Sequence, residues 1–190
     1  MQQRFVRGDV FVPLKQAGWE NSPVDEDAKK IALRMIPYGI YVLTAEAPDG
    51  RTAAATVNWV TQTSFKPPLI AVAVKADSTA NAVVGDAGMF ALNVLGKDQP
   101  GVAFAFFKPV ERSGDTIGDE TVEAGESGVP LLATAAAAVE CRVVETVAQG
   151  DHHIVIGEVI HARVNRPPSG RPDEAVLAMR NLGENVFYGG

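Results

Sequence analysis

The sequence RTAAATVNWVTQTSFKPPLIAVAV (residues 51–74) predicts the centre of a β-sheet. Its alanine, threonine and valine residues suit a pleated strand that a flat ligand can approach closely. Pro67 and Pro68 cannot donate to a sheet ladder, so one strand must end before them and another begin after them. The first strand carries uncharged hydroxyl and amide side chains, namely Thr56, Asn58, Thr61, Gln62 and Thr63. Such side chains suit either a neutral, planar, hydrogen-bonding ligand or an ordinary sheet face in water.

The composition of the chain is that of a single soluble globular domain. Its 190 residues are 46% hydrophobic and 21% charged. A net charge of −6 argues against a nucleic-acid partner, which needs a basic face. No apolar run approaches the ~20 residues of a membrane span, and the N-terminus lacks the hydrophobic block of a signal peptide. The single cysteine excludes an internal disulfide, so we expect a cytoplasmic protein without a membrane partner.

The segments before the central sheet predict an arm, a helix and a strand. Residues 1–24 are expected to form an N-terminal arm. Ser22 and Pro23 predict a helix start, with serine as the N-cap and proline in the first helical position. Apolar residues then recur at helical spacing until Pro37. A strand is expected at 40–45, followed by a Pro-Asp-Gly turn.

The segments after the central sheet predict two short helices and several strands. Ser78 is typical of a helix N-cap, and Gly88 of the residue that ends that helix. Residues 109–128 lack periodicity and predict a long loop. The other expected elements are a helix at 99–107 and strands at 89–95, 131–147, 152–164 and 175–179. Successive strands with tight turns favour a mostly β, antiparallel barrel at residues 25–180, followed by a C-terminal tail at 181–190.

The pattern of reactive residues argues against most catalytic sites. His152 and His153 are adjacent on a predicted strand and point to opposite faces, while His161 lies too far along it, so we expect no metal site. Cys141 alternates with charged residues, as a buried strand residue does. The chain contains no Gly-x-Ser-x-Gly elbow, Walker loop or Gly-x-Gly-x-x-Gly turn. These absences argue against a hydrolase, a P-loop enzyme and a Rossmann dinucleotide site.

The helix start at Ser78-Thr79-Ala80-Asn81 is a candidate phosphate site. Free backbone N–H groups, two hydroxyls and the helix dipole all favour an anion there, and Lys75 adds a charge. A plain helix cap is the alternative. The two candidate sites fit one ligand, with a neutral planar ring at residues 56–63 and a phosphate at Ser78 and Thr79.

Six motifs occur in an order that resembles a known family. They are Pro37-Tyr38-Gly39-Ile40-Tyr41-Val42-Leu43-Thr44, Thr56-Val57-Asn58-Trp59-Val60-Thr61, Pro67-Pro68-Leu69, Lys75-Ala76-Asp77-Ser78-Thr79, Phe90-Ala91-Leu92-Asn93-Val94-Leu95, and a C-terminal pair, ECRVVE (140–145) and GDHHIVIGEV (150–159). Over residues 36–164 the chain is similar to the flavin reductase-like domain family, the FMN-binding split-barrel proteins.

This resemblance implies a fold, a cofactor and partners. The implied fold is a split β-barrel, antiparallel and of Greek-key type, in a homodimer with FMN bound non-covalently near the interface. The implied activity is NAD(P)H-dependent flavin oxidoreduction, with NADH or NADPH as electron donor. A partner monooxygenase, or another electron acceptor, would receive the electrons.

The resemblance also implies which residues hold the flavin. Thr56, Val57 and Asn58 would line the isoalloxazine, and Ser78 and Thr79 would hold the phosphate. His152 matches the family's Gly-Asp-His motif beside flavin and nicotinamide, which makes it the candidate catalytic residue; the alternative is a histidine that caps its own turn. The full set of expected cofactor-binding residues is Thr56, Val57, Asn58, Trp59, Thr61, Thr63, Ser78, Thr79, Asn81 and His152.

Two positions depart from the family pattern. Trp59 stands where serine is common, and its ring would either stack on the ligand or block part of the pocket. Ala80 stands where threonine is common, which removes one hydroxyl from the phosphate segment. Besides the enzyme, two readings therefore stay open: a non-enzymatic FMN-binding electron carrier or sensor, and a split barrel that has lost flavin.

Overall fold

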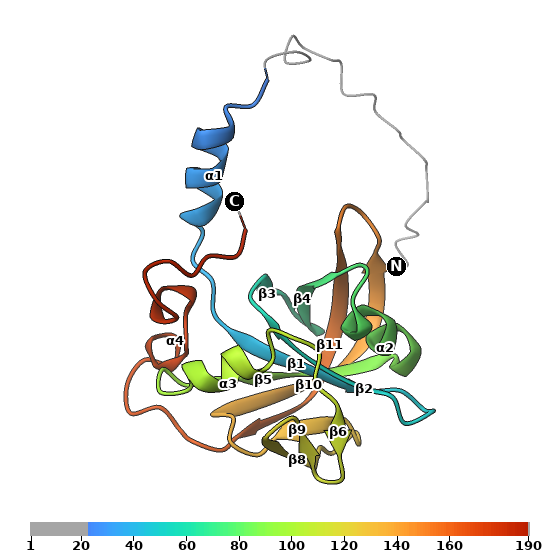
Figure 1. Ribbon diagram of the computed structural model, residues 1–190. Helices are drawn as coiled ribbons and strands as arrows, with labels where there is room; N and C mark the ends of the chain where they lie inside the picture. Colours follow the sequence, from blue (N-terminus) through green and yellow to red (C-terminus); the bar gives the residue numbers. More distant parts are fainter. Residues whose placement is uncertain (1–22, 190) are drawn as a thin grey trace, which may run out of the picture.

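The computed structural model describes residues 23–189, so most of the predicted N-terminal arm lies outside the described residues (Figure 1). Its main feature is a seven-stranded antiparallel sheet with the order β2-β1-β5-β10-β11-β4-β3. The strands are β1 (Tyr41–Glu46), β2 (Thr52–Val57), β3 (Val60–Phe65), β4 (Pro68–Lys75), β5 (Met89–Val94), β10 (Ala137–Val147) and β11 (His152–Val164). The prediction of a mostly β, antiparallel fold is confirmed.

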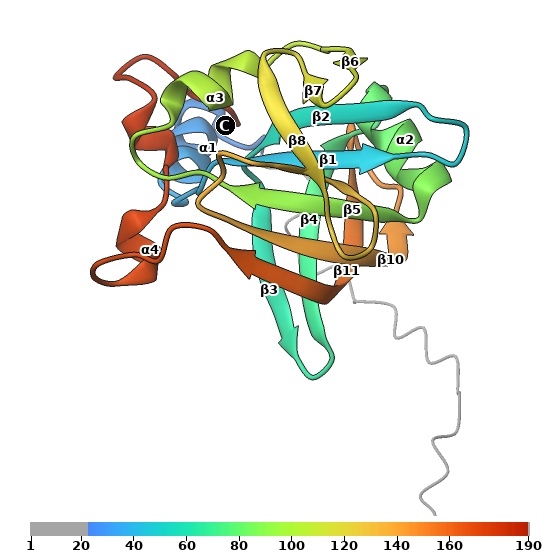
Figure 2. The same ribbon diagram turned by 90° about the horizontal axis from the view of Figure 1, so that it is seen from below.

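The two edge strands of this sheet are consecutive in sequence. β2 pairs only with β1 and β3 only with β4, yet Asn58 and Trp59 alone separate β2 from β3. The Ala73 N–H donates to the Trp59 carbonyl at 2.9 Å, which ties this link to β4. The sheet must therefore curl until its two edges lie near each other, although no ladder of paired strands closes it into a ring (Figure 2).

A second, four-stranded sheet occupies the segment that was expected to be a loop. Its strands are β6 (Arg112–Ser113), β7 (Thr116–Ile117), β8 (Glu120–Ala124) and β9 (Pro130–Leu132). Gly114, Gly118 and Gly128 have positive φ angles of 59°, 56° and 86°, so three tight turns fit within this short stretch. The prediction of an irregular loop at 109–128 was wrong because strands of two to five residues are too short to show periodicity.

Residues 23–189 form four α-helices outside the sheets. They are α1 (Glu26–Arg34), α2 (Thr79–Ala87), α3 (Pro100–Ala105) and α4 (Pro172–Ala175), with a 3₁₀ helix η1 (Met179–Asn181) near the C-terminus. α2 begins at Ser78 and ends at Gly88 as predicted. The N-cap of α1 is Asp25, whose carboxylate accepts from the N–H groups of Asp27 and Ala28, so the predicted start at Ser22 was too early.

The expected strand at 175–179 is not formed. α4 occupies its beginning, and only two isolated bridges follow, Gly39 to Ala178 and Gly96 to Val176. These bridges pair the chain with the residues just before β1 and just after β5, so the backbone is paired at single residues instead of along a ladder. No helix among residues 23–189 is long and apolar enough to cross a membrane.

Hydrophobic clusters cover the two faces of the sheet around β1. One core cluster lies between the sheet and α2 and includes Leu43, Phe90 and Cys141. Burial raises the pKa of the Cys141 thiol to about 12, which fits the expected inert core residue. A second cluster, around Leu95 and Leu177, lies on the other face among α3, the small sheet and the C-terminal segment.

Candidate functional site

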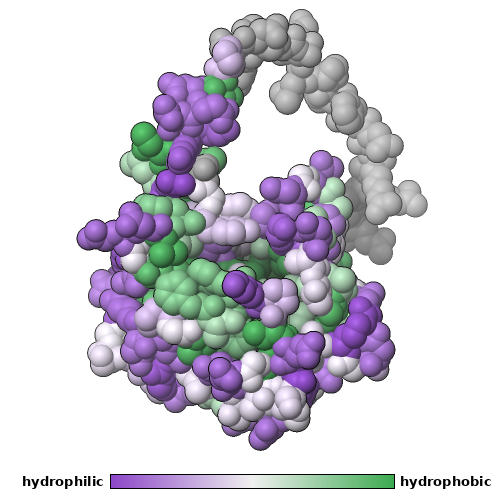
Figure 3. Space-filling model, in the orientation of Figure 1, coloured by the Kyte–Doolittle hydropathy of each residue, from purple (hydrophilic) through white to green (hydrophobic). Residues whose placement is uncertain are grey.

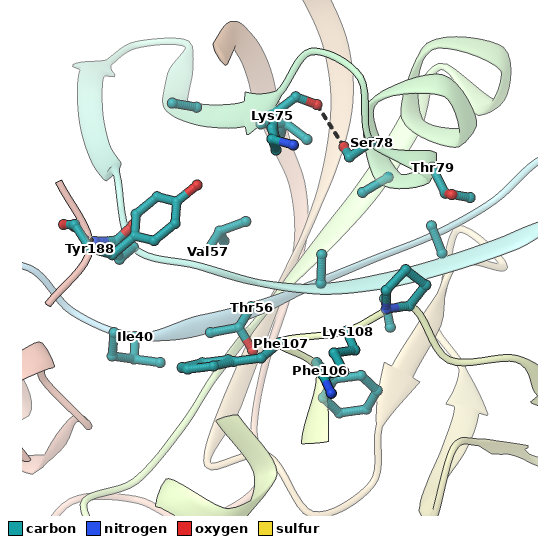
Figure 4. A pocket seen from close by; sticks show the side chains of 18 of the residues that line it. Ile40, Thr56, Val57, Lys75, Ser78, Thr79, Phe106, Phe107, Lys108 and Tyr188 are labelled. Atoms are coloured by element: carbon teal, nitrogen blue, oxygen red, sulfur yellow. Dashed lines mark hydrogen bonds between the residues drawn. The ribbon is translucent and has the colours of Figure 1, made fainter. Parts of the chain in front are cut away.

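A cavity of about 520 Å³ opens where the two ends of the curled sheet approach each other. On the face drawn in Figure 3, apolar side chains gather around a central hollow. The walls of the cavity are the outer edge of β2, the end of β4 with the start of α2, the chain after α3, and the C-terminal segment (Figure 4). Each wall comes from a different part of the sequence, which only the fold brings together.

The wall formed by β2 is smooth because its residues are small. Ala53, Ala54 and Ala55 line the cavity, and no side chain larger than a methyl group projects from these three positions. The Thr56 N–H points outward and donates to the Phe106 carbonyl at 3.1 Å. Because alternate residues of a strand point their backbone groups to the same side, Ala54 presents its N–H and C=O at the same open edge. A planar ligand can therefore pack on the alanines and bond to the backbone.

Thr56 and Asn58 are already bonded to the protein. The Thr56 hydroxyl donates to the Ala103 carbonyl at 2.7 Å, and the Asn58 amide donates to the Tyr188 carbonyl at 3.5 Å. Both residues line the cavity together with Val57, but these bonds fix α3 and the C-terminal segment to β2. Thr56 and Asn58 thus shape this wall of the cavity.

One end of the cavity is polar and carries positive charge. The Ser78 hydroxyl donates to the Lys75 carbonyl at 2.6 Å and accepts from the Asn81 N–H at 3.1 Å, so it is committed to capping α2. Thr79 is exposed, and Figure 4 places it and Ser78 on one side of the cavity with Lys108 on the other. The first N–H groups of a helix lack intrahelical partners, which suits an anion.

Lys75 adds charge to this polar end. Its ammonium group lies 2.9 Å from Asp77, and this hydrogen-bonded carboxylate raises the pKa of Lys75 and lowers that of Asp77. Lys75 and Asp77 both line the cavity. Both side chains of this ion pair are exposed, so an incoming anion can also bind to the Lys75 ammonium group.

An aromatic cluster lines the cavity on the side of Lys75 away from Ser78 and Thr79 (Figure 4), and Lys75 is the direct partner of His152 in the pairing of β4 with β11. His152 packs against Trp59 with ring centroids 4.8 Å apart, and Tyr188 packs against Trp59 at 5.4 Å. His152 Nδ1 lies 2.9 Å from Asp151 Oδ1, and Nε2 lies 2.8 Å from the Tyr188 hydroxyl. The bond to His152 is the main cause that lowers the pKa of Asp151, and burial raises the pKa of Tyr188.

The structure brings together some of the expected site residues and not others. The cavity is lined by six of them, Thr56, Val57, Asn58, Ser78, Thr79 and His152. Thr61 and Thr63 are exposed on β3 and do not line it, and Asn81 bonds to the Ala76 carbonyl at 3.1 Å. Trp59 packs against His152 and Tyr188 and does not itself line the cavity. Their assignment to flavin binding stays a prediction.

Several lining residues were not expected from the sequence. Phe107 and Lys108 follow α3, and Tyr188 belongs to the C-terminal tail. All three residues are distant in sequence from the stretch 51–74. Residues 181–190 were expected only to form a tail, and no local pattern in them indicates where they pack. His153 does not line the cavity, as expected for the neighbour of His152 on a strand. No cluster that could hold a metal ion occurs among the described histidine, cysteine and acidic residues.

The fold and the cavity define a class of protein: an open, curled antiparallel sheet with a ligand cavity at its free edge. The family model for the flavin reductase-like domain matches residues 33–182. The chain therefore belongs to the flavin reductase-like domain family.

Individual relatives agree with this assignment. The chain is 33% identical over 135 residues to a probable flavin reductase of Rhizobium meliloti, covering 71% of this chain but only 42% of that protein. It is 33% identical over 153 residues to the FMN reductase (NADH) SmoA of Agrobacterium fabrum, covering 80% of each chain. The styrene monooxygenase flavin reductase of Pseudomonas putida has a similar structure, with a TM-score of 0.61 and 29% identity over 73% of this chain and 87% of that one.

Proposed function

We propose that this protein is an NAD(P)H-dependent flavin oxidoreductase that binds FMN non-covalently in the cavity. The observation that carries the proposal is one continuous cavity with a smooth strand edge and aromatic end for a ring, and a cationic helix start for a phosphate. From Thr52 to Asn58 the wall runs for roughly 20 Å at the usual rise of a strand, a length comparable with an extended FMN molecule. The FMN and NADH named for the Agrobacterium relative agree with this choice.

The residues present fit this cofactor. Ala53, Ala54 and Ala55 form a cradle that a larger side chain would fill, and the Ala54 backbone offers one donor and one acceptor to the ring edge. Thr79 and Lys108 would hold the phosphate at the other end, with Lys75 between the two ends as a further cation. When bound, FMN supplies the group that accepts a hydride from nicotinamide. The chain itself binds and orients the reactants, excludes water with Phe106 and Phe107, and provides His152 as a hydrogen-bonding group at the ring end.

We also propose an assembly and a partner. Four aromatic side chains are exposed, namely Phe104, Phe107, Phe187 and Tyr188. Such exposed apolar side chains suit a homodimer with the flavin near the interface. Sedimentation equilibrium would then give twice the 20.1 kDa chain mass, and a monomer would contradict it. A partner monooxygenase that takes reduced flavin is the proposed electron acceptor, as the name of the Pseudomonas relative suggests.

The finer description of the fold is part of the same proposal. The two-residue link between the edge strands supports a split β-barrel of Greek-key type, in which the cavity lies at the split. We propose that residues 25–180 form this domain and that residues 181–190 are a tail added to it.

The visible spectrum of the purified protein tests the function directly. FMN-loaded protein is mixed anaerobically with NADH and, separately, with NADPH, while the flavin absorbance is followed. Loss of the oxidised flavin spectrum with either nucleotide is the expected result. A flavin that stays oxidised with both nucleotides, but is reduced by dithionite, would refute the reductase.

One observation favours a non-enzymatic electron carrier as the second candidate. Both ring nitrogens of His152 are already hydrogen-bonded within the protein, and Tyr188 covers the ring end. A carrier needs no room for nicotinamide there. The same spectrum separates the two functions, because only the reductase responds to a nucleotide.

Replacing Thr79 by valine is expected to weaken FMN binding about tenfold, because one bond to a charged phosphate is worth roughly 1.5–3 kcal/mol and this site is open to water. Riboflavin, which has no phosphate, should bind equally well to both proteins. Isothermal titration of each ligand measures the difference. Thr79 is preferable to Ser78, since Ser78→Ala also removes the cap of α2, at about 0.5–2 kcal/mol of stability.

Thr61→Val is the matched control for this experiment. It makes the same change on the exposed face of β3, outside the cavity, and should leave both affinities unchanged. Equal losses for FMN and riboflavin in Thr79→Val would contradict the phosphate assignment. A loss of FMN affinity in Thr61→Val would support the sequence-based prediction that β3 contacts the cofactor.

A further inference from the structure

The C-terminal segment 183–189 lies across the aromatic end of the cavity. It belongs to no strand or helix, and Phe187 and Tyr188 are 54% and 48% exposed. Both residues nevertheless line the cavity. The segment is thus a loosely packed cover over the end where the proposed ring would lie.

Arg34, at the end of α1, fastens this cover from outside the cavity. Its Nε donates to the Gly189 carbonyl at 3.2 Å, and its guanidinium lies 4.6 Å from the centre of the Phe187 ring. Figure 1 shows the C-terminus beside α1, which is far from it in sequence but near it in space. α1 itself buries none of its residues, so Arg34 is the main link between this helix and the cover.

Tyr188 uses the last free hydrogen-bonding position of His152. The Asp151 carboxylate only accepts hydrogen bonds, so Nδ1 carries a proton and donates to it at 2.9 Å. In the neutral imidazole Nε2 is then an acceptor, and it receives the Tyr188 hydroxyl at 2.8 Å. An imidazole has no third position. Any ligand that bonds to the His152 ring must first displace Tyr188.

We propose that Tyr188 competes with the pyridine nucleotide for His152 and thereby sets the affinity of the protein for the nucleotide. The inference rests on the proposed function, since it takes the nucleotide as the ligand that reaches His152. The nucleotide binds only to molecules in which Tyr188 has left His152, and its apparent affinity is reduced by the fraction that is closed. Weakening the closed state therefore strengthens nucleotide binding.

The test is the dissociation constant of NAD⁺ and of NADP⁺ for FMN-loaded protein, measured by isothermal titration without turnover. Tyr188→Phe keeps the ring against Trp59 and removes only the hydroxyl bonded to His152. The preferred nucleotide should bind about 2- to 10-fold more tightly to this variant, the range expected for one neutral hydrogen bond. Tyr38→Phe is the matched control, because the Tyr38 hydroxyl contacts only the Leu33 carbonyl and does not line the cavity.

Arg34→Ala is an independent variant with the same expected effect. It changes no residue that lines the cavity, and it removes the two contacts that hold Gly189 and Phe187. Lys29→Ala, on the same helix, loses only an ion pair with Glu26 and should bind nucleotide as the parent does. In a Trp19→Phe background Trp59 is the only tryptophan, and Arg34→Ala should change its fluorescence before any ligand is added.

The outcomes separate this inference from the proposed function. If the parent binds a nucleotide and Tyr188→Phe binds it equally well or more weakly, the proposed competition is overturned. The proposed reductase function is not affected by that result. If neither nucleotide binds to the parent or to any variant, the nucleotide assignment fails and the competition fails with it. Tighter binding in both Tyr188→Phe and Arg34→Ala, with no change in the two controls, supports the competition.

Discussion

Replacing His152 by alanine is expected to slow reduction of the bound flavin by NADH or NADPH more than tenfold. His152 is the one histidine that lines the cavity, and it lies at the end where the nicotinamide would stack on the flavin. Hydride transfer leaves negative charge on the flavin, and His152 can donate to that charge and lower the barrier once Tyr188 has left Nε2 and this nitrogen carries a proton. Stopped-flow absorbance under anaerobic conditions measures the rate. FMN affinity should change little, because the phosphate end is untouched.

His153→Ala is the control for this experiment. His153 is the next residue of β11 and does not line the cavity, so its loss should have a much smaller effect on the rate. If both variants reduce flavin as fast as the parent, His152 only stabilises the turn that begins at Asp151. A large loss in His153→Ala alone would mean that the wrong face of β11 was assigned to the site.

Replacing Asn93 by leucine is expected to lower the free energy of unfolding by about 3–5 kcal/mol, since three buried groups lose a partner. Asn93 belongs to β5, and its side chain is fully buried. Its amide donates to the Val42 carbonyl at 2.9 Å and to the Thr44 hydroxyl at 3.0 Å, and its carbonyl accepts from the Leu132 N–H at 2.8 Å. This side chain joins the large sheet to β9, which leucine cannot do.

Urea denaturation measures the effect, with Asn165→Leu as a graded control. The Asn165 amide makes one bond, to the Ala135 carbonyl at 3.0 Å, and Asn165 itself is exposed. The free energy of unfolding of Asn165→Leu should be lower than that of the parent by about 1 kcal/mol. Equal losses at the two positions would show that the bonds of Asn93 add nothing to the stability of the sheet.

Local signals in the sequence were sufficient where the structure is local. Ser78 and Gly88 bound α2 because a hydroxyl cap and a left-handed glycine act within one turn of their helix. The hairpin of β10 and β11 follows from alternation on both sides of one tight turn. The Pro67-Pro68 break also lies where β3 ends and β4 begins, because proline removes a donor wherever it stands.

The parts that could not be predicted depend on contacts between distant residues. The stretch 51–74 suggested one polar strand before Pro67, but β2 and β3 are separate and lie at opposite edges of the sheet. Thr61 and Thr63 are therefore exposed while Thr56 lines the cavity. Likewise Tyr188 reaches His152 only because the chain after α4 returns across the sheet, a path that no periodicity encodes.

The link at Asn58 and Trp59 has a consequence for the order in which the protein folds. Strands that follow each other in a chain are usually neighbours, and long-range pairings are slow because they must first close a large loop. Here β3 cannot join its sheet beside β2. It reaches its edge only through β4, which in turn needs β11, a strand that begins more than 70 residues later. We expect the two edges to meet last, so that amides of β2 and β3 gain hydrogen-exchange protection after those of β5 and β10; simultaneous protection would contradict this order. The ligand cavity would then be absent from every earlier folding intermediate.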